Sequence, residues 1–150
     1  QKPVVDSTPY YDVYPSTKLT DGDKGGNSYY ESDGFGENGE GAYFVIDLLQ
    51  VTSISQVLLF LNPDLSWEAR TQNLTIYGSN LNIGYNPTNK ATIEASYFEL
   101  VANNDALFDP VLGNFVQYEV SAQVRYVKVV IYSNSIPAGY GAQISEISIY

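Results

Sequence analysis

Two stretches near opposite ends of the chain carry the oxygen-bearing residues that a hard cation binds. Asp21 and Asp23 flank Gly22, so a turn at the glycine would bring both carboxylates to one side, and the hydroxyl of Ser28 follows. Glu146 is a single carboxylate in the largely apolar final stretch. Because calcium takes about six to eight oxygen ligands, the pattern predicts a structural calcium site where the two stretches meet. An ordinary Asp-Gly turn beside a solvated glutamate is the alternative.

A second group of residues has the chemistry of sugar binding. Trp67 is the only tryptophan and lies in a polar stretch rather than an apolar run, Arg70 follows three residues later, and Tyr140 stands between two glycines. An aromatic face stacks on a sugar ring, and a guanidinium forks onto neighbouring hydroxyls. The alternatives are a rim or packing role for Trp67 and a solvated or ion-paired Arg70.

Three further positions are weaker candidates for the same site. Glu31 is a candidate to face the cleft, and Asn134 is a candidate hydrogen-bonding partner of the ligand, for which a turn-forming role is the stronger alternative. Tyr30 is included with them, although packing in the interior is the favoured interpretation for this residue. A separate possibility is a shallow groove for an extended chain, lined by Tyr85 or Tyr97.

Composition excludes several classes of function. The chain of 150 residues has no Cys, His or Met, so a Ser-His-Asp triad, a Cys-His pair and a His-bearing zinc site are all ruled out. No nucleotide-binding glycine motif is present, and no acidic pair stands in a cleft-forming context, so we expect no enzyme. The net charge of −10 disfavours nucleic acid and anionic membranes as partners. The longest apolar run, at 57–61, is too short to span a bilayer.

The elements that position these residues are predicted to be strands. Apolar and β-branched segments separated by turn-rich gaps indicate an all-β protein, and helical periodicity is hard to find. The expected strands lie at 42–48, 54–61, 72–77, 97–101, 115–120, 125–132 and 143–150. Residues 1–150 are expected to form a single domain, a jelly-roll β-sandwich, excised from a larger protein.

Six short motifs, taken in order, resemble the discoidin family, also called the coagulation factor 5/8 type C family. They are DGD at 21–23, YES at 30–32, VIDL at 45–48, GS at 78–79, RYVK at 125–128 and SEI at 145–147. The resemblance implies a galactose-binding-like sandwich with a structural calcium. It adds the backbone carbonyls of Lys18, Ser28 and Ser145 as calcium ligands and places the sugar site on loops at one end. The segment 23–28 is longer than is usual, which makes Ser28 the least secure of these ligands.

The resemblance also indicates a function. Many bacterial members are family 32 carbohydrate-binding modules attached to glycoside hydrolases, so the chain resembles a secreted or cell-surface module that holds an enzyme on a polysaccharide. The run WEARTQ at 67–72 is similar to a pattern in a bacterial subgroup of these modules on polysaccharide-degrading enzymes, including α-glucan-cleaving ones. Many galactose-binding members use a His that this chain lacks, which favours an α-glucan or another neutral glycan. We expect a monomer. The alternative is an adhesion module for galactose-type host glycans or a protein partner.

Overall fold

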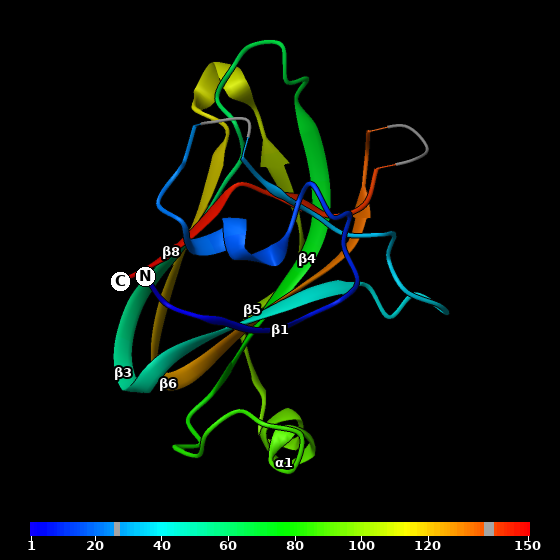
Figure 1. Cartoon of the computed structure of the whole chain (residues 1–150). Helices are drawn as coiled ribbons and strands as arrows, with labels where there is room; N and C mark the ends of the chain where they lie inside the picture. Colours follow the sequence, from blue (N-terminus) through cyan, green and yellow to red (C-terminus); the bar gives the residue numbers. More distant parts are fainter. Residues whose placement is uncertain (26–27, 137–139) are drawn as a thin grey trace.

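The computed structural model describes residues 1–25, 28–136 and 140–150, and it contains two sheets (Figure 1). The strands are β1 (Val4–Ser7), β2 (Tyr30–Glu31), β3 (Ala42–Phe60), β4 (Arg70–Ser79), β5 (Phe98–Phe108), β6 (Phe115–Asn134), β7 (Gln143–Ile144) and β8 (Glu146–Ile149). The large sheet has the order β1-β3-β6-β4-β5, with β8 also paired to β3, and the small sheet pairs β2 with β7. The expected all-β sandwich is therefore confirmed.

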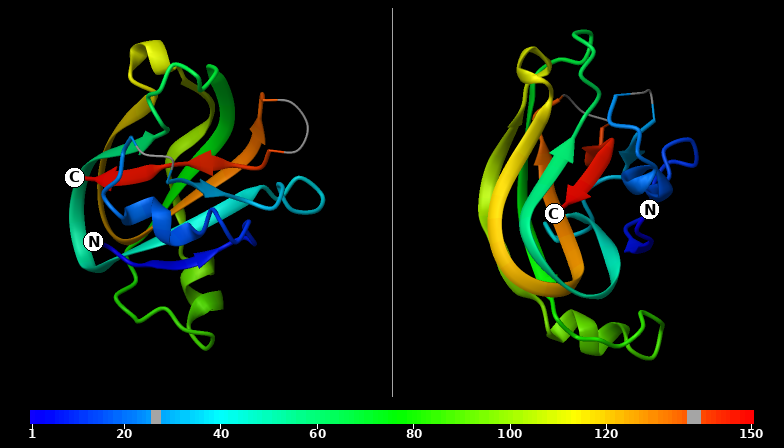
Figure 2. Two further views of the ribbon diagram at one scale, coloured as in Figure 1. Left: turned by 45° about the horizontal axis from the view of Figure 1, so that its top comes forward. Right: turned by 90° about the vertical axis from the view of Figure 1, so that its left-hand side faces the viewer.

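Two long strands, β3 and β6, build most of the large sheet. They pair antiparallel from Ala42 opposite Ile131 to Phe60 opposite Phe115, with register shifts that include the stretch from Asp47 to Thr52. Bulges of this kind bend a strand without ending it, and Figure 2 shows the resulting curled sheet. The sequence predicted two strands in each of these regions, whereas the structure joins each pair into one bent strand.

The core lies between the two layers and follows the alternation of the strands. Side chains at every second position point inward, because successive residues of a strand face opposite sides. Fully buried examples are Phe44, Ile46 and Leu59 on β3, Leu74 and Ile76 on β4, and Val129 and Ile131 on β6. Such residues supply the burial that stabilises a chain without disulfides.

A short helix that the sequence did not predict closes one end of the molecule. Helix α1 (Lys90–Ala95) buries Ile93 in a second apolar cluster with Val45 and Tyr126. A six-residue helix shows less than two turns of periodicity, so its pattern is too short to recognise. Two short 3-10 helices, η1 (Ser16–Thr20) and η2 (Pro110–Leu112), complete the regular structure of the described residues.

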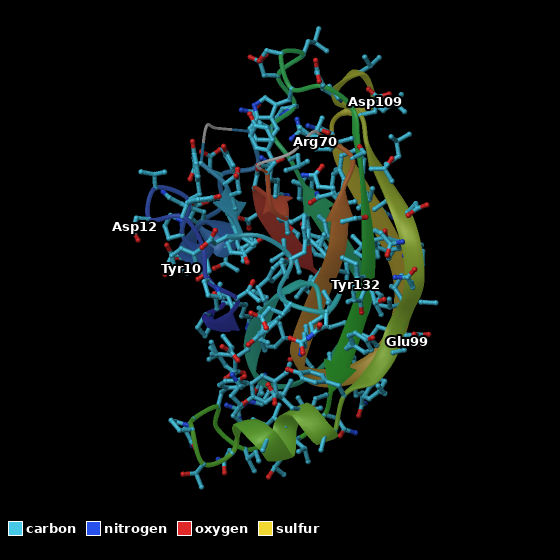
Figure 3. The ribbon with its side chains drawn as sticks, turned by 90° about the vertical axis from the view of Figure 1, so that its right-hand side faces the viewer. Tyr10, Asp12, Arg70, Glu99, Asp109 and Tyr132 are labelled. Carbon is cyan, nitrogen blue, oxygen red and sulfur yellow. The ribbon has the colours of Figure 1, made fainter. Side chains whose placement is uncertain are left out.

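The end opposite α1 is made of loops. Arg70 and Asp109 lie there, as Figure 3 shows, with α1 at the far end of the curved sheet. Both chain ends are bonded to β3, since Lys2 Nζ donates to Leu48 O at 3.0 Å and Tyr150 N donates to Gln56 O at 3.0 Å. Within the described ranges, no helix is long and apolar enough to cross a membrane.

Candidate functional site

A pocket of about 520 Å³ opens at the loop end of the sandwich. Several separate segments contribute to it, namely the residue before β2, the loop before β4, the first residue of β4, the end of the β6–β7 connection and the first residue of β7. Its lining consists of Tyr29, Ser66, Trp67, Glu68, Arg70, Ile136, Tyr140 and Gln143. Three of the predicted sugar-binding residues, Trp67, Arg70 and Tyr140, are thus brought together. A volume of this size is typical of small-molecule sites.

Arg70 is held rigidly in the wall of the pocket. Only 6% of the residue is exposed. Its Nε donates to the carbonyl oxygen of Glu68 at 3.2 Å, its Nη1 donates to Oε1 of Gln143, and its guanidinium lies 4.8 Å from the Trp67 ring centroid. Burial lowers the pKa of Arg70 from its usual value, although nearby Tyr29 and Glu68 act to raise it. The side chain remains a cation whose direction is fixed by its neighbours.

Gln143 connects that cation to a buried carboxylate. Its Nε2 donates to Oε2 of Glu31 at 2.8 Å, while its Oε1 accepts from Arg70. The backbone of Gln143 exchanges two further bonds with the side chain of Gln72, which ties β7 to β4. Glu31 is only 4% exposed and lies behind Gln143. The prediction that Glu31 faces the cleft is therefore wrong, because its carboxylate is used inside the protein.

The aromatic side chains differ in how much of each ring is open. Tyr140 is 50% exposed, whereas Trp67 is half-buried and has Arg70 against its ring. Tyr29 meets Trp67 edge-on, with centroids 4.9 Å apart, and stacks on Tyr14 at 4.3 Å. Burial raises the pKa of Tyr29, as do its hydrogen bond to Tyr14 and the charge of Glu31. Tyr140 is therefore the ring best placed to stack on a ligand.

Two other predicted contacts serve the framework instead. Tyr30 is fully buried among core rings, so the packing interpretation favoured for it is confirmed and a sugar-binding role for it is wrong. Asn134 donates to Gly141 O at 3.1 Å and to Gln143 Oε1 at 3.2 Å, and its Oδ1 accepts from Ile136 N at 3.1 Å. These bonds match the turn-forming alternative for Asn134.

Tyr29 and Gln143 are the functional candidates that sequence reasoning missed. Tyr29 precedes Tyr30 directly, so alternation in an extended segment would have placed one ring inward and the other outward. Gln143 is a polar residue in a largely apolar segment, and its uncharged amide does not indicate that it bonds to the charged side chains of Arg70 and Glu31. Ser66, Glu68 and Ile136 were also missed, and their residue types carry no specific signal.

At the other predicted groove, Tyr85 and Tyr97 pack against other side chains of the protein. The hydroxyl of Tyr85 donates to Oδ2 of Asp6 at 2.6 Å, and its ring contacts Tyr126. Tyr97 belongs to the same cluster, and its hydroxyl is buried without a hydrogen-bond partner among the described residues. Burial raises the pKa of both phenols, as does the charge of Asp6. Neither ring is presented as the floor of an open groove.

The acidic loop does meet the final strand. Gly22 N donates to Oε2 of Glu146 at 3.0 Å, which joins residues 124 positions apart. Oxygen atoms of Asp21 accept from Asp23 N at 2.9 Å and from the hydroxyl of Ser28 at 3.1 Å, and Lys18 Nζ lies 3.7 Å from Asp21 Oδ2. Burial raises the pKa of Glu146, and the charges of Asp21 and Asp23 raise it further, against the hydrogen bond from Gly22.

The oxygen ligands of this loop are of the kind that a hard cation binds, but they do not converge on one point in this arrangement. Within the described ranges, no group of three acidic side chains converges closely enough to hold a metal ion by itself. The buried Glu146 carboxylate nevertheless lies near two other carboxylates, and Ser145 beside it has a buried hydroxyl with no partner in the described chain. A cation would stabilise both features. The calcium site, including the carbonyls of Lys18, Ser28 and Ser145, stays a prediction.

The family follows from the sequence itself. Residues 18–129 match the family model of F5/8 type C domains, described as NedA-like, galactose-binding. The chain belongs to this family, which confirms the resemblance, and as a domain of this type it is non-catalytic. No curated protein matches the chain.

Solved structures with the same fold include modules of polysaccharide-degrading enzymes. CpGH89CBM32-4 of Clostridium perfringens has a TM-score of 0.66 at 18% identity, over 99% of this chain and 94% of that chain. Chitosan-binding module 2 of a Paenibacillus sp. IK-5 chitosanase/glucanase, in complex with chitotriose, has a TM-score of 0.67 at 17% identity, over 99% and 95%. The CBM32 of AlyQ, in complex with 4,5-unsaturated mannuronic acid, has a TM-score of 0.61 at 18% identity, over 100% and 98%. Identities this low establish the fold alone.

Proposed function

We propose that the chain is a carbohydrate-binding module that holds a neutral polysaccharide, an α-glucan before others, in the loop-end pocket. The single observation that carries this proposal is the convergence of an exposed Tyr140, a half-buried Trp67 and a fixed Arg70 in one open pocket. An exposed ring supplies a stacking face, and the remaining guanidinium N–H groups donate to sugar hydroxyls. The α-glucan preference rests on the WEARTQ pattern at 67–72.

The charges around the pocket support a neutral ligand. The positive charge of Arg70 is balanced by the buried carboxylate of Glu31, which it reaches through the Gln143 amide. The remaining charged side chain of the lining is the exposed carboxylate of Glu68, and the chain as a whole carries −10. A polyuronate would meet repulsion from Glu68 and from the field of the whole molecule.

A tethering role in a secreted or cell-surface enzyme fits such a site. The chain aligns with a module-sized part, 14%, of the much longer CpGH89 chain, seen in complex with GlcNAc-alpha-1,4-galactose. Weak and reversible binding is enough in that role, because attachment to a polymer raises the effective concentration of the linked enzyme. The parent enzyme of this chain would then determine which bonds are cut.

Binding to a polysaccharide panel tests the proposal. The isolated domain is applied to starch, α-1,3-glucan, β-1,3-glucan, chitosan, galactan and pectate, with Tyr140→Ala and Trp67→Ala beside it. Retention on a neutral glucan, weakened by about tenfold in either variant, is the expected result. Tyr85→Ala is the matched control, since it removes a tyrosine ring from the α1 end and should leave retention unchanged. Retention on galactan instead would favour the galactose-type adhesion alternative, and retention on nothing would overturn the proposal.

The acidic loop would hold a structural calcium ion. The carboxylates of Asp21, Asp23 and Glu146 supply the charge, and the carbonyls of Lys18, Ser28 and Ser145 would complete an oxygen cage. Bound calcium would neutralise the buried Glu146 and tie the loop to β8. Calcium at a hundred times its Kd should stabilise the fold by about 2.7 kcal/mol, seen as a higher Tm. Glu146→Gln should lose this shift and Glu68→Gln should keep it; a wild-type Tm that calcium does not move would refute the site.

A further inference from the structure

An aromatic row continues from the pocket onto the N-terminal segment. Trp67 contacts Tyr29 at 4.9 Å between ring centroids, and Tyr29 stacks nearly parallel on Tyr14 at 4.3 Å and 20°. The three rings therefore form an unbroken apolar path that starts in the pocket lining and ends outside it.

The backbone fixes Tyr14 at the end of that row. Glu31 N donates to Tyr14 O at 3.2 Å, Tyr14 N donates to Tyr11 O at 2.7 Å, and Tyr11 N donates to Glu31 O at 3.2 Å. The turn at 11–14 is thus bonded to β2, the strand that follows Tyr29. Backbone hydrogen bonds therefore hold Tyr14 in position beside Tyr29.

The same turn exposes much apolar surface for so acidic a chain. Val13 is 73% exposed, Tyr11 is 41% exposed, and Tyr14 between the turn and the pocket is half-buried. Figure 3 shows the segment through Tyr10 and Asp12, on the side of the molecule below the end that carries Arg70. Contiguous apolar surface next to a pocket is typical of an interaction site.

From this continuity we infer that the glycan surface extends beyond the pocket, over Tyr29 and onto Tyr14, as a second subsite for further sugar units of the same chain. The inference rests on the proposed function and adds that an extended segment, rather than one terminal sugar, is held. Phenol rings offer a flat face and a hydroxyl, which sugars use together. Leu65 and Val111, which are exposed on other loops of this end, are aliphatic and offer neither.

Paired short and long oligosaccharides test the second subsite. Calorimetry compares maltose with maltoheptaose and chitobiose with chitohexaose on the folded domain. The longer member of a bound pair should bind about threefold to tenfold tighter than the shorter in the wild type. Tyr14→Ala should bring that ratio close to one, while Tyr14→Phe, which keeps the ring, should retain most of it. Thermal melts of both variants exclude unfolding as the cause.

Two controls make the outcome specific. Tyr10→Ala removes a nearby, similarly exposed tyrosine whose ring packs edge-on against Tyr30 at 6.3 Å instead of joining the row, so it should keep the ratio. Leu65→Ala removes an exposed aliphatic side chain that is not part of the row, so it should also keep the ratio. A ratio near one in the wild type, a ratio that Tyr14→Ala leaves intact, or a ratio lost in Leu65→Ala would overturn the second subsite alone. Absence of binding to both series would overturn it together with the α-glucan assignment.

Discussion

Each end of the sandwich places a cation against aromatic rings, but with opposite results. At the loop end the guanidinium of Arg70 lies over Trp67, and at the α1 end the ammonium of Lys128 lies 4.5 Å from the Tyr43 ring centroid and 5.5 Å from that of Tyr97. Both cations are desolvated, since burial lowers the pKa of each. One end nevertheless opens as a pocket, while the other is closed by packing.

Covering elements and polar partners explain the difference. At the α1 end, Asp6 accepts from the Tyr43 hydroxyl at 3.3 Å, from the Tyr85 hydroxyl at 2.6 Å and from Lys90 Nζ at 2.7 Å. At the loop end, the corresponding charges are satisfied beneath the surface through Gln143, which leaves Tyr140 half-exposed. A tyrosine-rich region is therefore a binding candidate only where its polar partners lie below the rings and no helix lies above them.

The largest expected effect is a difference in stability between two glycine-to-alanine variants, one at each end of the sandwich. A Cβ on Gly141 would clash with the carbonyl oxygen and hydroxyl of Ser32, whereas a Cβ on Gly84, in the loop before α1, would meet nothing within 4 Å. Gly141→Ala should therefore cost about 3 kcal/mol or more of unfolding free energy, and it should weaken glycan binding by displacing Tyr140. Gly84→Ala should be neutral or slightly stabilising. Urea unfolding of both variants measures the contrast, and equal stabilities would contradict the close packing beside the pocket.

The next largest effect is expected when the cation at each end is removed in turn. Arg70→Ala removes the guanidinium from the pocket wall and leaves Glu31 without its charge balance, so glycan binding should fall by about tenfold to a hundredfold. Lys128→Ala, at the α1 end, should leave binding unchanged. Arg70→Lys keeps the charge but not the planar fork, so it should recover only part of the affinity. Equal effects of Arg70→Ala and Lys128→Ala on calorimetric affinity would remove the functional distinction between the ends.

A smaller effect is expected at Asp6, which serves stability alone. Burial acts to raise the pKa of Asp6, but hydrogen bonds from Lys90 and Tyr85 outweigh it and hold the pKa below the ordinary 3.8. A carboxyl whose pKa is lowered on folding stabilises the protein above its unfolded pKa and loses this contribution as the pH falls through the folded value. Asp6→Asn should cost about 1–2 kcal/mol at pH 7, and the difference from wild type should shrink below about pH 4. A pH-independent difference in denaturant midpoints would contradict this account; glycan binding should not change.

The fold was predictable because its information is local and repeated. Alternating apolar residues at 42–48 and 72–77 indicate strands wherever they occur, and the turn-rich gaps between them indicate a sandwich. What alternation does not contain is a bulge, so the single bent strand β3 was read as two. Helix α1 was missed because six residues are held by packing around Ile93 rather than by their own periodicity.

The site was predictable only where a residue stood out against its surroundings. Trp67 and Tyr140 were recognised because large rings in polar or glycine-rich loops have little reason to be buried. Glu31 was misplaced because the burial of a side chain depends on a distant partner, here Gln143. The predicted groove at Tyr85 or Tyr97 was wrong for the same reason, since the sequence does not show that Asp6 lies beside Tyr85. The burial of Tyr30 against Phe44, in contrast, matches the packing interpretation favoured for it.

The smallest expected effect is on the unfolding free energy when Lys128, the cation of the α1 end, is replaced. Among the described residues, the Lys128 side chain has no ion pair or hydrogen bond. Burial opposes its charge, while the rings of Tyr43 and Tyr97 favour it. Lys128→Met keeps the length and apolar stem of the side chain. We expect it to change the unfolding free energy by no more than about 0.5 kcal/mol, because the two contributions nearly cancel. A loss above about 2 kcal/mol would mean that the cation is essential to the α1 end, and the two ends would then differ in exposure but not in how they use a buried charge.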